Sequence, residues 1–141
     1  MSSSASHTIN LTPAEAFAAI ALVAIAADGV IANSESQILR ATFARMQLFQ
    51  DYSAESKNEM LTRLLDQIKQ QGYEALMKVA VQKIPPDLKE TAFAVATDIT
   101  LSDGELADEE EQLLDALYNS LGLSEEIAAK IIDVMLIKNK G

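Results

Sequence analysis

Apolar positions recur at helical spacing along almost the whole chain. From Pro13 to about Ala27 they occupy nearly every face of a predicted helix, which indicates a helix buried on most sides. Each later segment carries a single apolar stripe, as expected for a helix with one face in a core. No segment alternates apolar and polar residues between turn signals, so no strand is predicted. The pattern predicts an all-α, single-domain bundle of about seven helices.

Local signals place the ends of these helices. Thr12 followed by Pro13 predicts the first helix start, and Asp28-Gly29 predicts its end. The later helices are expected to begin at caps supplied by Asn33 or Ser34, Ser53 or Ser56, Asp87, Asp108 and Ser124, and to be separated by Gly72, Ile84-Pro85-Pro86 and Gly122. Glu111 is expected to complete a capping box with Asp108. Residues 1–10 lack apolar periodicity and are predicted to be a flexible segment, which leaves 11–141 as the helical domain.

One part of the sequence is written twice. The segment around Asp28-Gly29 returns around Asp103-Gly104, at a spacing of 75 residues (103 − 28). The same register matches Glu15 with Glu90, Ala19 with Ala94, Ala21 with Ala96, Ala41 with Ala116 and Leu48 with Leu123. The repeated unit is therefore a helix, an Asp-Gly turn and a second helix. A pseudo-twofold arrangement of the two copies would bring the two turns together.

Charge and composition narrow the class of function. The 21 acidic and 11 basic residues give a formal charge of −10, and residues 90–129 contain no Lys or Arg. Such a field disfavours binding to nucleic acids and anionic membrane surfaces, and favours cations and basic protein partners. Most basic residues lie in the stretch between the repeats, where they are interpreted as solvated helix faces: Lys57, Arg63, Lys69, Lys78, Lys83 and Lys89. The longest apolar stretch has 12 residues, against about 20 needed to span a bilayer, so no membrane insertion is expected.

The sequence contains few of the residues and motifs that enzymes use for catalysis. The chain has no cysteine, one histidine outside the predicted helices, and no Gly-rich phosphate loop. It also lacks Trp and has only seven Phe and Tyr in all, few for a sugar-binding cleft. The protein is therefore predicted not to be an enzyme. A hydrolase that uses paired carboxylates is the alternative from a different class.

The two turns are candidates for a divalent-cation site. Each copy reproduces the second half of an EF-hand loop, with the acidic pairs Asp28 with Glu35 and Asp103 with Glu110. The first-half ligand positions would fall on Ala24 and Ala26 in one copy and on Ile99 and Leu101 in the other, which excludes a self-sufficient EF-hand loop. A site shared between the turns remains open, for Ca²⁺, Mg²⁺, Mn²⁺ or Zn²⁺, with Asp28, Glu35, Asp103 and Glu110 as ligands and Asp98 and Asp108 as auxiliaries.

Simpler roles for the same residues stay open. The two aspartates would then accept backbone hydrogen bonds in their turns, and Glu35 and Glu110 would only lie at the positive ends of their helices. Asp98 replaces Val23 of the first copy inside an apolar helix, so it must face solvent, find a donor or meet a cation. An acidic surface for a protein partner, without metal, is a further alternative. A homodimer through Met135, Leu136 and Ile137 is also possible on this pattern.

The paired Asp-Gly-x-Ile/Leu turns, each followed by a glutamate in the next helix, resemble the TerB-like tellurite-resistance family over Leu11 to Lys138. The resemblance implies a single domain of about seven helices with internal pseudo-symmetry. It also implies a non-enzymatic, metal-linked or complex-forming cytoplasmic component of resistance to tellurite and other chemical stress. The acidic turn positions of the family fall on Asp28, Glu35, Asp103 and Glu110. Asn33 and Ser34 replace Asp108 and Glu109 in the first copy, which lowers its charge.

Overall fold

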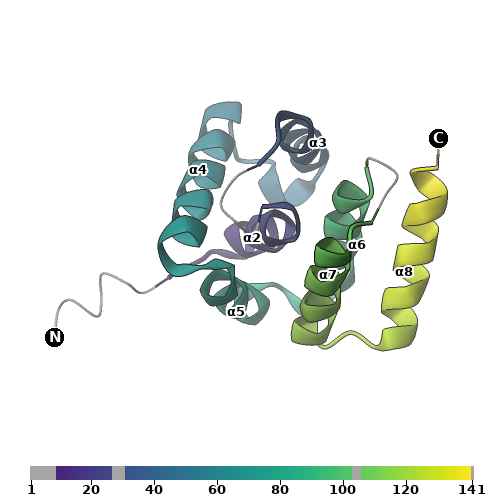
Figure 1. Cartoon of the computed structure of the whole chain (residues 1–141). Helices are drawn as coiled ribbons and strands as arrows, with labels where there is room; N and C mark the ends of the chain where they lie inside the picture. Colours follow the sequence, from purple (N-terminus) through teal and green to yellow (C-terminus); the bar gives the residue numbers. More distant parts are fainter. Residues whose placement is uncertain (1–8, 27–30, 103–105, 141) are drawn as a thin grey trace, which may run out of the picture.

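Seven α-helices and two short 3₁₀ helices make up the part of the chain that the computed structural model describes, residues 9–26, 31–102 and 106–140 (Figure 1). Along the chain they are α2 (Pro13–Ile25), α3 (Asn33–Ala44), η1 (Gln47–Phe49), α4 (Ala54–Gln71), α5 (Tyr73–Lys83), η2 (Pro86–Leu88), α6 (Lys89–Thr100), α7 (Asp108–Leu121) and α8 (Glu125–Lys138). These described ranges contain no β-strand. The predicted all-α fold of about seven helices is confirmed.

Helix α2 lies at the centre of the bundle, with α4, α5, α6 and α7 packed against it (Figure 1). Ten of its thirteen side chains are buried, which agrees with its apolar residues on every face. Its start is the predicted one, because the Thr12 hydroxyl accepts a hydrogen bond from the Glu15 amide at 3.2 Å and the Glu15 carboxylate accepts one from the Thr12 amide at 2.9 Å. Arg63 of α4 pairs with the same carboxylate.

The two copies of the repeat contact each other reciprocally. Helices α2 and α6, which precede the two Asp-Gly turns, pack together at the centre of the bundle. In addition α2 contacts α7 of the other copy, and α6 contacts α3. A twofold relation between the copies predicts this exchange of partners, but the copies differ internally, because α6 packs against α7 whereas α2 has little contact with α3. The separating helices α4 and α5 lie on one side of the pair, and α8 covers α6 on the other (Figure 1).

Several predicted helix ends are confirmed by their local geometry. Ser53 and Ser124 cap α4 and α8, accepting hydrogen bonds from the amides of Ser56 and Ile127 at 3.0 and 3.2 Å. Gly72, with φ of 87°, separates α4 from α5, and Gly122, with φ of 74°, ends α7 in the left-handed conformation. Helix α5 stops before Pro85, as a residue preceding proline favours extended backbone.

Three predicted helix starts are wrong. Neither Asn33 nor Ser34 caps α3, and Asp108 does not cap α7. The cap residues are Ala32 and Ala107, so Asn33 and Asp108 are already the first helical residues. The predicted box with Glu111 fails for the same reason, since Glu110 holds the third helical position. Asp87 lies inside η2, where the Leu88 amide bonds to the Pro85 carbonyl at 2.9 Å, so α6 starts only at Lys89.

The two ends of the described chain differ in burial. Ile9 and Leu11 lie in the core, so the predicted flexible segment 1–10 contains a buried residue, while its residues 1–8 lie outside the described residues. At the other end α8 buries only Ala128 fully and leaves Val134, Leu136 and Ile137 exposed. None of the described helices is long and apolar enough to cross a membrane.

Candidate acidic site

Glu35 and Glu110 occupy the same position in their helices, three residues after an extended alanine. The Glu35 carboxylate accepts a hydrogen bond from the Ala32 amide at 3.4 Å, and the Glu110 carboxylate accepts one from the Ala107 amide at 3.0 Å. Alanine has no side-chain acceptor, so each helix start has only the glutamate half of a capping box. Both carboxylates therefore stabilise helix starts.

Asp98 reaches from α6 to the end of α8. Its carboxylate accepts hydrogen bonds from the Lys138 ammonium at 3.1 Å and from the side-chain amide of Asn139 at 2.8 Å. The side chain of Asp98 is 24% exposed. The same side-chain amide of Asn139 also donates to the Met135 carbonyl at 2.9 Å, which fixes its orientation. The sequence left three alternatives for this carboxylate: solvent, a hydrogen-bond donor or a cation. The structure shows that it has hydrogen-bond donors. Asp98 thus ties α6 to α8.

The first turn of α7 carries four consecutive carboxylates, from Asp108 to Glu111. Asp108, Glu109 and Glu111 are exposed, and Glu110 is half-buried. Carboxylates at this position interact favourably with the unpaired amides of a helix N-terminus. Four of them exceed what one helix start needs, and they give this end of the molecule a strongly negative surface. We refer to Asp108, Glu109, Glu110 and Glu111 as the α7 acidic turn.

The remaining two predicted ligands, Asp28 and Asp103, lie outside the described residues, as do Gly29 and Gly104. Within the described ranges no three His, Cys, Asp or Glu side chains are placed to hold a metal ion. The structure therefore brings no cation site together from Glu35, Glu110, Asp98 and Asp108 alone. The shared site stays a prediction from the sequence.

One cavity does collect carboxylates. It has a volume of about 420 Å³ and is lined by Glu55, Glu59 and Asp66, with Arg63 beside them. All of its lining residues belong to α4, so the acidic groups project from one face of one helix. Glycoside hydrolysis needs two carboxylates that flank the scissile bond. This cavity does not offer opposing walls for such a pair.

Two helix-turn-helix copies that exchange partners across α2 and α6, each with a glutamate at one helix start, define an acidic, all-helical repeat domain. The family model described as "Tellurite resistance protein TerB" matches residues 14–132. The chain therefore belongs to the TerB tellurite-resistance family, which is generally non-enzymatic. Comparisons with curated proteins and with solved structures returned no match.

Proposed function

We propose that this TerB-family protein is a non-enzymatic, cytoplasmic component of tellurite or chemical-stress resistance, and that it acts by holding a divalent cation at the acidic starts of α3 and α7. The observation that supports this proposal is that both copies of the repeat have a glutamate at the start of their second helix. Glu35 and Glu110 stand at equivalent positions in helices that pack reciprocally with α6 and α2. A symmetric pair of carboxylates is a natural starting point for a site whose ligands come from two loops.

The ligand set of the proposed site is all oxygen. Asp28 and Asp103 would complete it with Glu35 and Glu110, and Asp108 would add charge from the α7 acidic turn. Asp98 contributes only if Lys138 and Asn139 release its carboxylate, because both donate to it in this structure. Oxygen ligands suit Ca²⁺, Mg²⁺ and Mn²⁺ better than Zn²⁺, which prefers nitrogen and sulfur.

A basic protein partner is the second candidate. The exposed side chains of Asp108, Glu109 and Glu111 favour it, since three carboxylates on one helix turn attract a positively charged surface at a distance. Such an interaction weakens at high ionic strength, because salt screens exposed charges. Cation binding and partner binding through the same turn are compatible.

The test is a series of thermal melts of metal-stripped protein with Ca²⁺, Mg²⁺, Mn²⁺ and Zn²⁺. At an ion concentration 100 times the dissociation constant, the folded state gains about 2.7 kcal/mol, which raises the melting midpoint by several degrees. Asp28→Asn and Asp103→Asn are expected to lose this gain. Asp133→Asn, on the exposed face of α8, is the matched control and keeps it. If no ion shifts the melt, or both turn variants respond like the parent, the cation proposal is wrong and the basic partner remains.

A further inference from the structure

Helix α8 is apolar on more sides than the bundle covers. Apolar residues fill most of its length from Ile127 to Ile137, yet only Ala128 is fully buried. The helix lies at the edge of the bundle and packs mainly against α6 (Figure 1). Val134, Leu136 and Ile137 are 56%, 43% and 74% exposed, and among the described residues they are the large apolar side chains that are exposed. Single exposed apolar residues are ordinary, whereas several within one helical turn mark an interaction surface.

One outward face of α8 has the spacing of a helix–helix contact. Ile127, Ile131, Val134 and Ile137 follow one another at steps of four, three and three residues, so they lie along one side of the helix. Ile127 and Ile131 are half-buried at the border with the bundle, and Val134 and Ile137 are exposed. This stripe therefore turns away from the bundle along its length. We name these four residues the α8 stripe.

The stripe differs from the dimer contact that the sequence suggested. Met135 is half-buried and follows the buried Ala128 by seven residues, so it faces the bundle. Leu136 comes two residues after Val134, which places it on the other side of the helix. Of the three residues in that contact, only Ile137 belongs to the α8 stripe.

The charges of α8 favour a second copy of the chain as the partner. The first turn carries Glu125 and Glu126 and the last turn carries Lys138, with Lys130 and Asp133 between them. In an antiparallel pair of α8 helices, Glu126 lies opposite the partner's Lys138. In the same register, Lys130 lies beside the partner's Asp133, and the twofold axis repeats both pairs. Parallel pairing would instead set like charges against each other, so the helix is complementary to itself in one orientation only.

The charged groups are available for such pairing. Lys130 and Glu126 form an ion pair within the helix at 3.3 Å, and their side chains are 69% and 77% exposed. An exposed pair of this kind contributes little to stability, so exchanging its partners costs little. Lys138 donates to Asp98 but remains 58% exposed, and an ammonium group has three donors.

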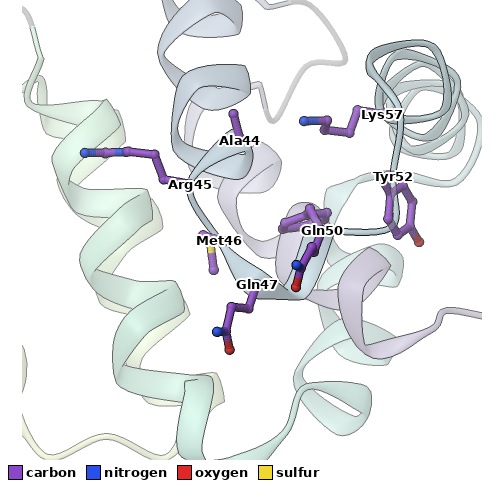
Figure 2. A pocket seen from close by; sticks show the side chains of 8 residues that line it. Ala44, Arg45, Met46, Gln47, Gln50, Tyr52 and Lys57 are labelled. Atoms are coloured by element: carbon purple, nitrogen blue, oxygen red, sulfur yellow. The ribbon is translucent and has the colours of Figure 1, made fainter.

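A head-to-tail contact, in which α8 docks into a cavity of the next copy, fits these observations less well. The cavity between the end of α3 and the start of α4 has a volume of about 380 Å³, and Arg45, Gln47 and Gln50 place polar groups around it (Figure 2). Phe49 also lines it but is only 2% exposed. A mainly polar lining does not match an apolar stripe. Any head-to-tail contact would also leave one α8 stripe uncovered at the end of a growing chain.

We propose that two copies of this chain form a twofold dimer in which their α8 stripes pack antiparallel. Ile127 then lies against the partner's Ile137, and the ion pairs lie along the edges of the apolar contact. One helix per subunit makes a small interface, so the dimer is weak, with a dissociation constant on the order of 10–100 µM. The inference does not depend on the proposed cation site.

Sedimentation equilibrium of the full chain in EDTA, from about 5 to 500 µM, tests the proposal. The mass is expected to rise from the monomer value of 15.2 kDa to twice that value and no further. Val134→Ser and Ile137→Ser are each expected to raise the dissociation constant at least about tenfold, because each removes apolar contact area twice in the dimer. Leu136→Ser, on the other side of α8, is the control and leaves it unchanged. These side chains are exposed, so the variants retain the fold, which circular dichroism verifies.

Charge exchange tests the antiparallel orientation. Lys130→Glu and Asp133→Lys each set like charges beside each other across the twofold axis, so each is expected to weaken the dimer about fivefold or more. An equimolar mixture of these two variants is expected to recover parent-like association, because each changed residue then meets an opposite charge. Lys69→Glu, on α4, changes the net charge as Lys130→Glu does and is expected to leave the dimer intact. About 0.5 M NaCl should reduce all of these differences.

Three results would overturn the proposal. They are a parent chain that keeps the monomer mass at about 500 µM, a mass that exceeds the dimer, and a Leu136→Ser variant that dissociates as readily as Ile137→Ser. Unchanged association in both Lys130→Glu and Asp133→Lys would exclude the antiparallel orientation. A monomeric chain that sediments with phosphatidylcholine vesicles, and loses this in Ile137→Ser, would assign the α8 stripe to a lipid surface instead.

Discussion

The α2–α3 copy and the α6–α7 copy share one backbone plan but differ in what surrounds them. Helix α2 is enclosed by α4, α5, α6 and α7, and its positions Leu22 and Val23 are buried and apolar. The equivalent positions of α6 are Thr97 and Asp98. The Thr97 hydroxyl donates to the Phe93 carbonyl at 2.7 Å, and Asp98 meets α8. The comparison shows that the neighbours of each copy determine which polar groups it can hold.

The second helices of the copies differ in charge more than in shape. Helix α3 contains one Glu and one Arg, a net charge of zero, whereas α7 contains five acidic and no basic residues, a net charge of −5. Arg40 corresponds to Asp115, and Arg45 corresponds to Ser120. A duplicated unit has thus kept its backbone while its exposed faces diverged. The α7 acidic turn therefore has no counterpart in the first copy.

The largest expected difference concerns the aromatic clusters. Phe43 is buried and contacts the rings of Phe17 and Phe49, whereas its counterpart Tyr118 is half-buried and contacts only Phe93 among the described rings. Phe43→Ala is expected to lower the free energy of unfolding by about 3–5 kcal/mol, and Tyr118→Ala by about half as much. Urea denaturation measures both. Equal losses would show that the copies contribute equally to the core.

A smaller effect tests how tightly the two central helices are enclosed. Ala19 is fully buried, whereas the equivalent Ala94 is partly exposed. Ala19→Leu is expected to cost about 1–3 kcal/mol, because added methyl groups must displace packed neighbours. Ala94→Leu should change stability by less than about 0.5 kcal/mol. If Ala94→Leu proves as costly in the same denaturation assay, α6 is as enclosed as α2 and the comparison fails.

The smallest expected effect is an increase in the free energy of unfolding when the cap residue of either copy is replaced. Ala32 and Ala107 have φ and ψ of −71° and 149° and of −70° and 153°, close to those of the serine cap Ser124. Ala32→Ser and Ala107→Ser should each raise the free energy of unfolding by about 0.5–1 kcal/mol, since each completes a capping box with its glutamate. Ala129→Ser, within α8, serves as control and should not stabilise. A lower free energy of unfolding in either cap variant would show that the helix start in question does not have the geometry of a capping box.

Much of the fold was predictable because helices depend on local signals. Ser53, Gly72, Gly122 and Ser124 act on adjacent backbone, so their effects were predicted correctly. The starts of α3 and α7 were misplaced by one residue because Asn33 and Asp108 are good caps in isolation. The alternative start lets the glutamate at the third position reach the preceding amide, and alanine at the cap gives no sequence signal for it.

The candidate sites were less accessible from sequence. The family resemblance was confirmed, while the acidic turn positions that it implies stay a prediction. The donors to Asp98 could not be inferred, because Lys138 and Asn139 are 40 and 41 residues away and only the packing of α8 on α6 brings them close.

The central position of α2 has a consequence for synthesis of the chain. The most apolar helix is the first of the described helices to be synthesised, but α6, one of its main neighbours, begins at Lys89, 64 residues after α2 ends at Ile25. At about 5–20 residues per second, α2 waits roughly 3–13 s for that partner. During this interval only α4 and α5 can cover α2, so the face of α2 that later packs against α6 and α7 stays exposed in the nascent chain. Codon choice or chaperone capture at this stage would therefore control the yield of folded protein without altering the finished molecule.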